Sequence, residues 1–85
     1  MSASTICKKA FTGLYRHYKN KQVYRVLDIV LHTETQQHMV LYKELIQSEQ
    51  NPNNLRFVRP FEMFTELVEY NGKMVPRFEK VSKEN

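Results

Sequence analysis

QVYRVLDIVLH, residues 22–32, is the stretch that decides the fold of this chain. It is rich in the β-branched and aromatic residues that strands favour, and it contains neither glycine nor proline. In a strand, alternate side chains point to opposite faces, so Val23 and Ile29 share one face. Tyr24 and Val26 share the other face. Because apolar side chains occupy both faces, we expect a long, curved strand that changes neighbours along its length, as the strands of small barrels do.

Shorter strand-like segments with turn signals between them surround this stretch. The expected strands cover residues 12–19, 38–47, 55–59, 67–70 and 73–78, and a single helical turn is expected at 61–64 after Pro60. Asn-Pro-Asn-Asn at 51–54 marks a loop, and Asn71-Gly72 is the strongest hairpin signal. Strands at intervals of about 10 residues predict a mostly β fold. We expect a small SH3-like barrel or a rolled antiparallel sheet of about five to six strands with one short helical turn.

The chain has 85 residues, which is enough for one domain with one small core. Residues 12–79 are expected to form a single small β-barrel domain. Residues 1–11, a mostly polar stretch, are expected to be a loose leader. The charged residues 80–85 are expected to be a frayed tail.

Composition bounds the class of protein and its compartment. With 41% apolar and 26% charged residues, the chain matches average globular usage, which argues against a disordered or membrane-embedded class. The net charge of +4 permits contact with phosphate-rich or acidic partners without demanding it. Cys7 is the only cysteine, so no intramolecular disulfide is possible and a reducing compartment fits. No apolar run approaches the roughly 18 residues of a membrane span. We therefore expect a cytoplasmic protein without membrane contact.

GLYRHYK, residues 13–19, places two aromatic rings, a histidine and two cations within one short segment. As a strand, it puts Tyr15 and His17 on one face and Leu14, Arg16 and Tyr18 on the other. Neither face is a plain hydrophobic core face. The segment therefore suggests a surface that recognises a ligand, although it names no reaction.

Several short motifs in a fixed order resemble one known family. They are Gly13–Lys19, His32–Thr35, Val40–Tyr42, Phe57–Pro60, Met63–Phe64 and Val75–Phe78. Together they resemble the bacterial domain-of-unknown-function family 1653, whose members are small proteins without an assigned activity. The resemblance implies the domain boundaries and fold class and gives no function to inherit. In this chain Asn20 stands where the family is expected to carry glycine, and Phe57 stands in place of an expected tryptophan and lacks its indole N–H donor.

Metal binding and catalysis have little support in the sequence. The side chains of His17, His32, His38 and Cys7 do not have the spacing of a metal site, so no metal and no cofactor are expected. His32 with Glu34 offers an acid–base pair, but a strand-end histidine that hydrogen-bonds its own loop is the favoured interpretation. Nucleophile and phosphate-loop motifs are missing from the sequence. We expect a protein that is not an enzyme.

A set of aromatic and basic residues on the expected strands forms the candidate cation–aromatic face. Its members are Tyr15, His17, Tyr42, Phe57, Arg59 and Arg77; with His32 and Glu34 they complete the candidate ligand-binding residues. Planar rings stack on bases and arginine binds phosphate, so such a face suits nucleic acid or a nucleotide. The alternative is that Tyr42 and Phe57 are core residues and that the arginines pair with Glu44, Glu66 or Glu69.

Two classes of function therefore stay open. The first is a non-enzymatic module that binds nucleic acid or a nucleotide through the cation–aromatic face. The second is a protein-interaction or homodimerisation module without nucleic-acid binding, which would use exposed strand edges and apolar residues such as Met39 and Leu41.

Overall fold

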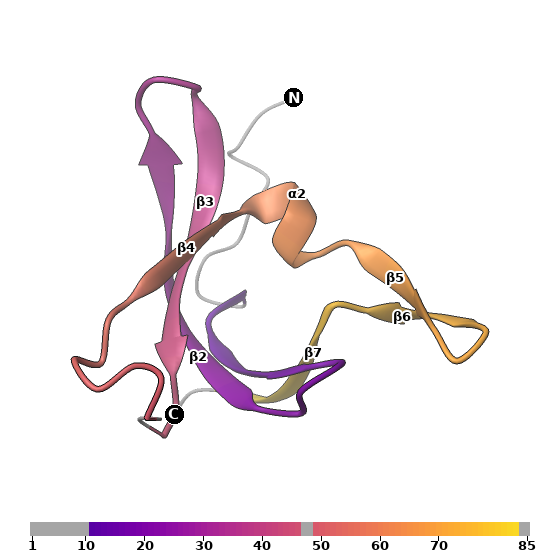
Figure 1. Cartoon of the computed structure of the whole chain (residues 1–85). Helices are drawn as coiled ribbons and strands as arrows, with labels where there is room; N and C mark the ends of the chain where they lie inside the picture. Colours follow the sequence, from indigo (N-terminus) through magenta and orange to yellow (C-terminus); the bar gives the residue numbers. More distant parts are fainter. Residues whose placement is uncertain (1–10, 47–48, 84–85) are drawn as a thin grey trace.

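A computed structural model describes residues 11–46 and 49–83 and confirms the predicted mostly β class (Figure 1). The elements in chain order are β1 (Gly13–His17), β2 (Val23–His32), β3 (Gln37–Glu44), β4 (Phe57–Pro60), α2 (Phe61–Phe64), β5 (Leu67–Tyr70), β6 (Lys73–Pro76) and β7 (Phe78–Lys83). The helical turn predicted after Pro60 is α2. The strand predicted at 73–78 is divided at Arg77 into β6 and the start of β7.

Five of the strands form one curled antiparallel sheet with the order β4-β3-β2-β1-β7. The sheet bends into a half-barrel, with β4 and β7 as its edges, and α2 lies at its open side (Figure 1). The remaining strands, β5 and β6, form a separate two-stranded hairpin that projects from this body. The fold is thus the rolled sheet of the two forms predicted from the sequence.

A bulge in β2 explains why both faces of residues 22–32 are apolar. Val26 pairs with Tyr42 and Ile29 pairs with Val40, and the register shifts between Val26 and Asp28. Tyr42 and Val40 are two residues apart on β3, so they share one face, and their partners must share it too. The extra residue in β2 therefore turns Ile29 onto the concave face with Val26, where both are buried. Simple alternation placed these two residues on opposite faces.

Aromatic rings fill the concave side of the half-barrel. The buried cluster consists of Tyr15, Val26, Val40, Tyr42, Phe64 and Phe78. Phe64 of α2 is 1% exposed and stacks on Phe78 of β7, with 4.1 Å between ring centroids and an interplanar angle of 1°. The helical turn α2 therefore covers the open side of the half-barrel and contributes one ring, Phe64, to the core.

Two predicted boundaries need correction at the ends of the domain. The Phe11 ring packs against Tyr15, Phe61 and Phe64, so the last residue of the predicted loose leader belongs to the core. Residues 80–83, predicted as part of a frayed tail, continue β7 and pair with β1. Phe11 adds a ring to the small core, and residues 80–83 lengthen the edge strand that pairs with β1. Residues 1–10 and 84–85 lie outside the described residues.

The predicted hairpin turn at Asn71-Gly72 is confirmed. Both residues have positive φ, 54° and 79°, as a type I′ turn requires, and the flanking Tyr70 and Lys73 pair directly. Backbone hydrogen bonds fix the base of this hairpin to the body: the Tyr18 N–H donates to the Arg77 carbonyl at 3.0 Å. The hairpin formed by β5 and β6 is therefore held beside the turn that joins β1 to β2.

We expect Gly72→Val to lower the free energy of unfolding by about 1 kcal/mol or more. A Cβ at this position would meet no atom within 4 Å, so the penalty arises from the left-handed backbone alone. Gly72→Asn is the matched control, because asparagine tolerates this geometry and should lose less. Urea melts of the three proteins measure the difference, and equal stability of the valine variant would contradict the turn assignment.

Candidate functional site

Two members of the cation–aromatic face, Tyr15 and Tyr42, lie in the core. Each is only 6% exposed, so neither presents a ring face to a ligand. The Tyr15 hydroxyl donates to the Phe11 carbonyl at 2.6 Å, and burial raises the pKa of Tyr15 to about 12. The centroid of the Tyr42 ring lies 5.4–5.6 Å from those of neighbouring rings, including Phe64 and Phe78. For Tyr42, this is the core position that the alternative interpretation of the sequence described.

Phe57 and Arg59 extend this core toward the open side of the half-barrel. The Phe57 ring is half-buried against Tyr42, at 5.6 Å between centroids. The Arg59 guanidinium lies 5.6 Å from the centre of the Phe78 ring, and its Nε donates to the Tyr42 hydroxyl at 3.5 Å. Arg59 of β4 thus reaches a ring of β7 and helps to bridge the two edges of the sheet by a cation–π contact.

Arg77 connects α2 to the hairpin. Its guanidinium forms an ion pair with Glu66 at 3.0 Å, and its Nε donates to the Met63 carbonyl at 3.2 Å. This is the pairing with Glu66 that the sequence offered as the alternative to ligand binding. Much of its hydrogen-bonding capacity is therefore used within the fold.

His32 and Glu34 lie at the turn between β2 and β3. The Nδ1 atom of His32 accepts the backbone N–H groups of Glu34 and Thr35, each at 3.3 Å. This is the loop hydrogen bond favoured over an acid–base pair. The ten residues of β2 separate this turn from the β1–β2 turn, so the pair lies at the opposite end of β2 from His17. The structure therefore does not bring these two residues to the remaining candidates.

His17 stands between the core and the surface. Its half-buried ring meets Phe78 edge-on, and its Nδ1 accepts the Lys19 N–H at 3.1 Å, so the neutral imidazole carries its proton on Nε2. Burial lowers the pKa of His17, and the charges of Arg59, Arg77 and Lys19 lower it further. At neutral pH, His17 is thus an uncharged N–H donor.

The surface side of His17 opens on a cavity of about 200 Å³, which we name the turn cavity. Residues that line it include Arg16, His17, Tyr18, Lys21, Tyr70 and Glu79. It lies between the β1–β2 turn and the β5–β6 hairpin. The rings of Tyr18 and Tyr70 meet edge-on at 5.3 Å, and the Lys21 ammonium lies 5.2 Å from the Tyr70 ring centre. Exposed cations and half-buried rings thus gather around one hollow.

Comparison with known proteins assigns the fold and the sequence to one family. The model of the family "Protein of unknown function (DUF1653)" matches residues 13–80. The chain belongs to the DUF1653 family. A solved structure that resembles it is the crystal structure of a DUF1653 protein from Bordetella bronchiseptica, with 25% sequence identity and a TM-score of 0.74. The match covers 99% of this chain and 97% of that one. No curated protein matches.

The turn cavity of this DUF1653 protein has the chemistry of an anion site with aromatic walls. Arg16 and Lys21 supply positive charge, His17 supplies an N–H, and Tyr18 and Tyr70 supply hydroxyls and ring edges. Glu79 also lines the cavity and lies opposite Arg16 in the register of β1 and β7. Within residues 11–46 and 49–83, no three His, Cys, Asp or Glu side chains gather as a metal site, and no helix has the length and apolarity needed to cross a membrane.

Sequence reasoning reached only part of this cavity. Residues 13–19 drew attention to Arg16, His17 and Tyr18, whereas Lys21 and Tyr70 were not among the candidates. The sequence signal for these two residues is their position next to turns. Lys21 belongs to the turn Asn20-Lys21, and Tyr70 directly precedes the turn Asn71-Gly72. Their meeting depends on how the two hairpins dock, which local patterns do not specify.

Proposed function

We propose that this DUF1653 domain is a non-enzymatic binding module whose turn cavity takes a phosphate group of a nucleotide or nucleic acid. The observation that supports this function is the gathering of Arg16, Lys21 and the His17 N–H beside the Tyr18 and Tyr70 rings. Cations and N–H donors bind phosphate oxygens, while aromatic side chains contact sugars and bases. A cytoplasmic location, suggested by the single cysteine, is part of the same proposal.

The size of the cavity favours a phosphate or one nucleotide over a large ligand. Its volume of about 200 Å³ is below the roughly 300 Å³ at which sites for drug-sized molecules begin. The net charge of +4 favours a polyanion over a neutral ligand. A single strand of nucleic acid, with one phosphate at the cavity and neighbouring bases against exposed surface, fits both features.

Binding of fluorescent single-stranded RNA and DNA at about 50 mM salt tests this function. Lys21→Asn, which tolerates the positive φ of 64° at that position, should weaken binding about two- to fivefold and reduce the salt slope by about one ion. Arg16→Gln should do the same. Arg56→Gln is the matched control, because it removes an exposed cation outside the cavity and should have a smaller effect.

Two results would contradict the proposal. One is the absence of binding to either nucleic acid, and to mononucleotides, by a folded sample at low salt. The other is an equal loss from Arg56→Gln and Lys21→Asn, which would indicate general attraction to net charge instead of a defined cavity.

A protein-interaction or homodimerisation role is the second candidate, and exposed apolar side chains on α2, β5 and β6 favour it. Met63, Leu67 and Met74 are 46%, 56% and 62% exposed. The residues named from the sequence are less accessible, because Met39 is buried and Leu41 is half-buried. A mass that rises with protein concentration, without salt-sensitive nucleic-acid binding, would favour this role.

A further inference from the structure

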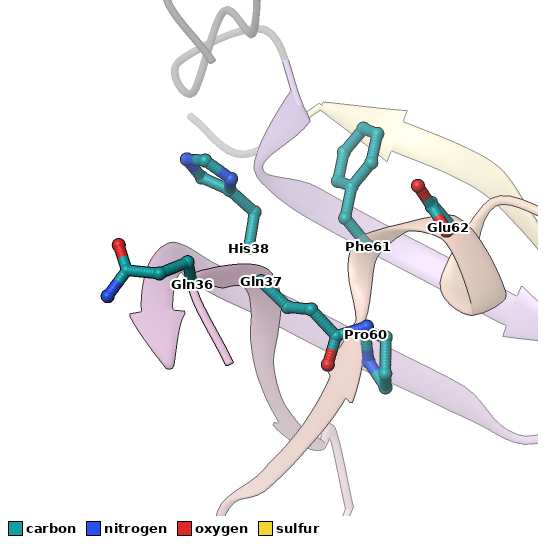
Figure 2. Close-up of a pocket in the computed structure, with 6 residues that line it drawn as sticks. All are labelled: Gln36, Gln37, His38, Pro60, Phe61 and Glu62. Carbon is teal, nitrogen blue, oxygen red and sulfur yellow. The ribbon is translucent and has the colours of Figure 1, made fainter. Parts of the chain in front are cut away.

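A second hollow lies where the start of β3 meets the start of α2, and we name it the α2 pocket. Its volume is about 230 Å³. Its lining comprises Gln36, Gln37, His38, Pro60, Phe61 and Glu62 (Figure 2). Strand pairing ends here, because Met39 opposite Pro60 is the last pair between β3 and β4. The chain then turns away into α2, which leaves the hollow between the two elements.

Two planar rings flank the opening of the α2 pocket. In Figure 2, the His38 imidazole and the Phe61 ring extend to the same side of the chain, with a space between them, and Glu62 lies beyond Phe61. Both rings are half-buried. The Phe11 ring contacts Phe61, with 5.3 Å between ring centroids, and both rings pack against the core. The flat surfaces of the His38 and Phe61 rings suit a flat group.

The amides at the base of the pocket are oriented by the hairpin turn. Gln36 donates its Nε2 to the Thr33 carbonyl at 2.7 Å, and the Oε1 of Gln37 accepts the Thr35 hydroxyl at 3.2 Å. Figure 2 shows the Gln36 amide directed away from Phe61 and Glu62, so Gln36 forms part of the pocket wall.

The charge of the pocket differs from that of the turn cavity. Glu62 is exposed, and its carboxylate forms no ion pair or hydrogen bond with any described residue. The His38 ring also has no hydrogen-bond partner within the described part of the chain. No lysine or arginine lines the pocket. On a protein of net charge +4, this lining thus has one carboxylate and no lysine or arginine near it to balance the charge within the pocket.

We propose that the α2 pocket binds a guanidinium group, the head of an arginine side chain. A guanidinium is flat and gains a cation–π contact where it lies against the Phe61 ring, next to Glu62. Its paired N–H groups match the two oxygens of Glu62, the residue next to Phe61. The volume is suited to one side chain instead of a larger molecule. The proposal is independent of phosphate binding at the turn cavity.

Competing ligand chemistries fit less well. An ammonium is more strongly hydrated than a guanidinium and cannot bind a carboxylate with two parallel N–H groups. A phosphate would be repelled by Glu62. A neutral nucleobase could enter between the rings but would gain no charge–charge attraction from the carboxylate.

Titration of isotope-labelled protein by NMR tests the proposal with three small probes. Nα-acetylarginine amide should shift the signals of Gln36, Gln37, His38 and Glu62 at about 10 mM, with a dissociation constant near 1 mM. Nα-acetylcitrulline amide has the same flat shape without charge, and Nα-acetyllysine amide has the charge without the shape. Both should bind about fivefold more weakly or worse. A short peptide with one internal arginine distinguishes a protein partner from free arginine, because added affinity would come from its backbone.

Glu62→Gln should weaken binding of the arginine probe about five- to tenfold while leaving the fold unchanged, since Glu62 is exposed. Glu69→Gln, an exposed carboxylate on β5, is the matched control and should change nothing at the pocket. The proposal is overturned if arginine and citrulline probes bind equally, if the shifts avoid the pocket, or if Glu62→Gln and Glu69→Gln have the same effect.

Discussion

Phe64→Ala should lower the free energy of unfolding by about 3–5 kcal/mol, the cost of removing a fully buried aromatic ring. Phe64 is 1% exposed, stacks on Phe78 at 4.1 Å, and meets the rings of Tyr15 and Tyr42 edge-on at 5.4 Å each. A domain of this size has only about 4–13 kcal/mol of stability, so the substitution should remove a large share of it and would unfold the protein at the low end of this range. Movement of α2 into the cavity left by the ring would also disturb the ion pair between Arg77 and Glu66.

Met63→Ala is the matched control for this prediction. It lies beside Phe64 in the same helical turn but is 46% exposed, so its loss should change stability by no more than about 0.5 kcal/mol. Urea unfolding followed by circular dichroism measures both variants. If both substitutions lower the free energy of unfolding by a similar, small amount, the Phe64 ring does not hold α2 against the half-barrel.

The features that the sequence predicted are those written in local patterns. Residues 22–32 form β2 within one residue of the predicted start, Pro60 precedes α2, and Asn71-Gly72 forms the turn. The bulge after Val26 was missed, because apolar residues on both faces reveal curvature but not the position of the extra residue. The extent of strand β7 was not predicted, because lysines near the end of a sequence are typical of a frayed tail. Only its pairing with β1, which local sequence does not reveal, makes this segment a strand.

The candidate site was harder to predict because position in a strand does not determine exposure. Tyr15 and His17 do share a face, yet Tyr15 is buried under Phe64 while His17 reaches the surface. Which of the two rings remains available depends on α2, which arrives from far along the chain. Likewise, Lys21 and Tyr70 meet only when two hairpins dock.

Substitution of Tyr15 by phenylalanine should change how stability responds to alkaline pH. Burial raises the pKa of Tyr15 from 10.0 to about 12, and its hydroxyl needs its proton to donate to the Phe11 carbonyl. The unfolded chain therefore releases this proton more readily than the folded one. A pKa raised by folding contributes stability that is fully present below the unfolded value, so the contribution of Tyr15 is intact below pH 10.0 and is lost as the pH rises toward 12.

Tyr15→Phe should be less stable than the natural protein at about pH 8, by about 1 kcal/mol for the lost hydrogen bond. Between pH 10.0 and about 12, that difference should shrink or reverse, because phenylalanine has no proton to lose. Tyr18→Phe is the control at about pH 8: its hydroxyl has no hydrogen-bond partner among the described residues, so this variant should be about as stable as the natural protein. Urea midpoints across this pH range report both variants. If the urea midpoints of the natural protein and of Tyr15→Phe fall in parallel as the pH rises, ionisation of Tyr15 does not contribute to the loss of stability, and the prediction is wrong.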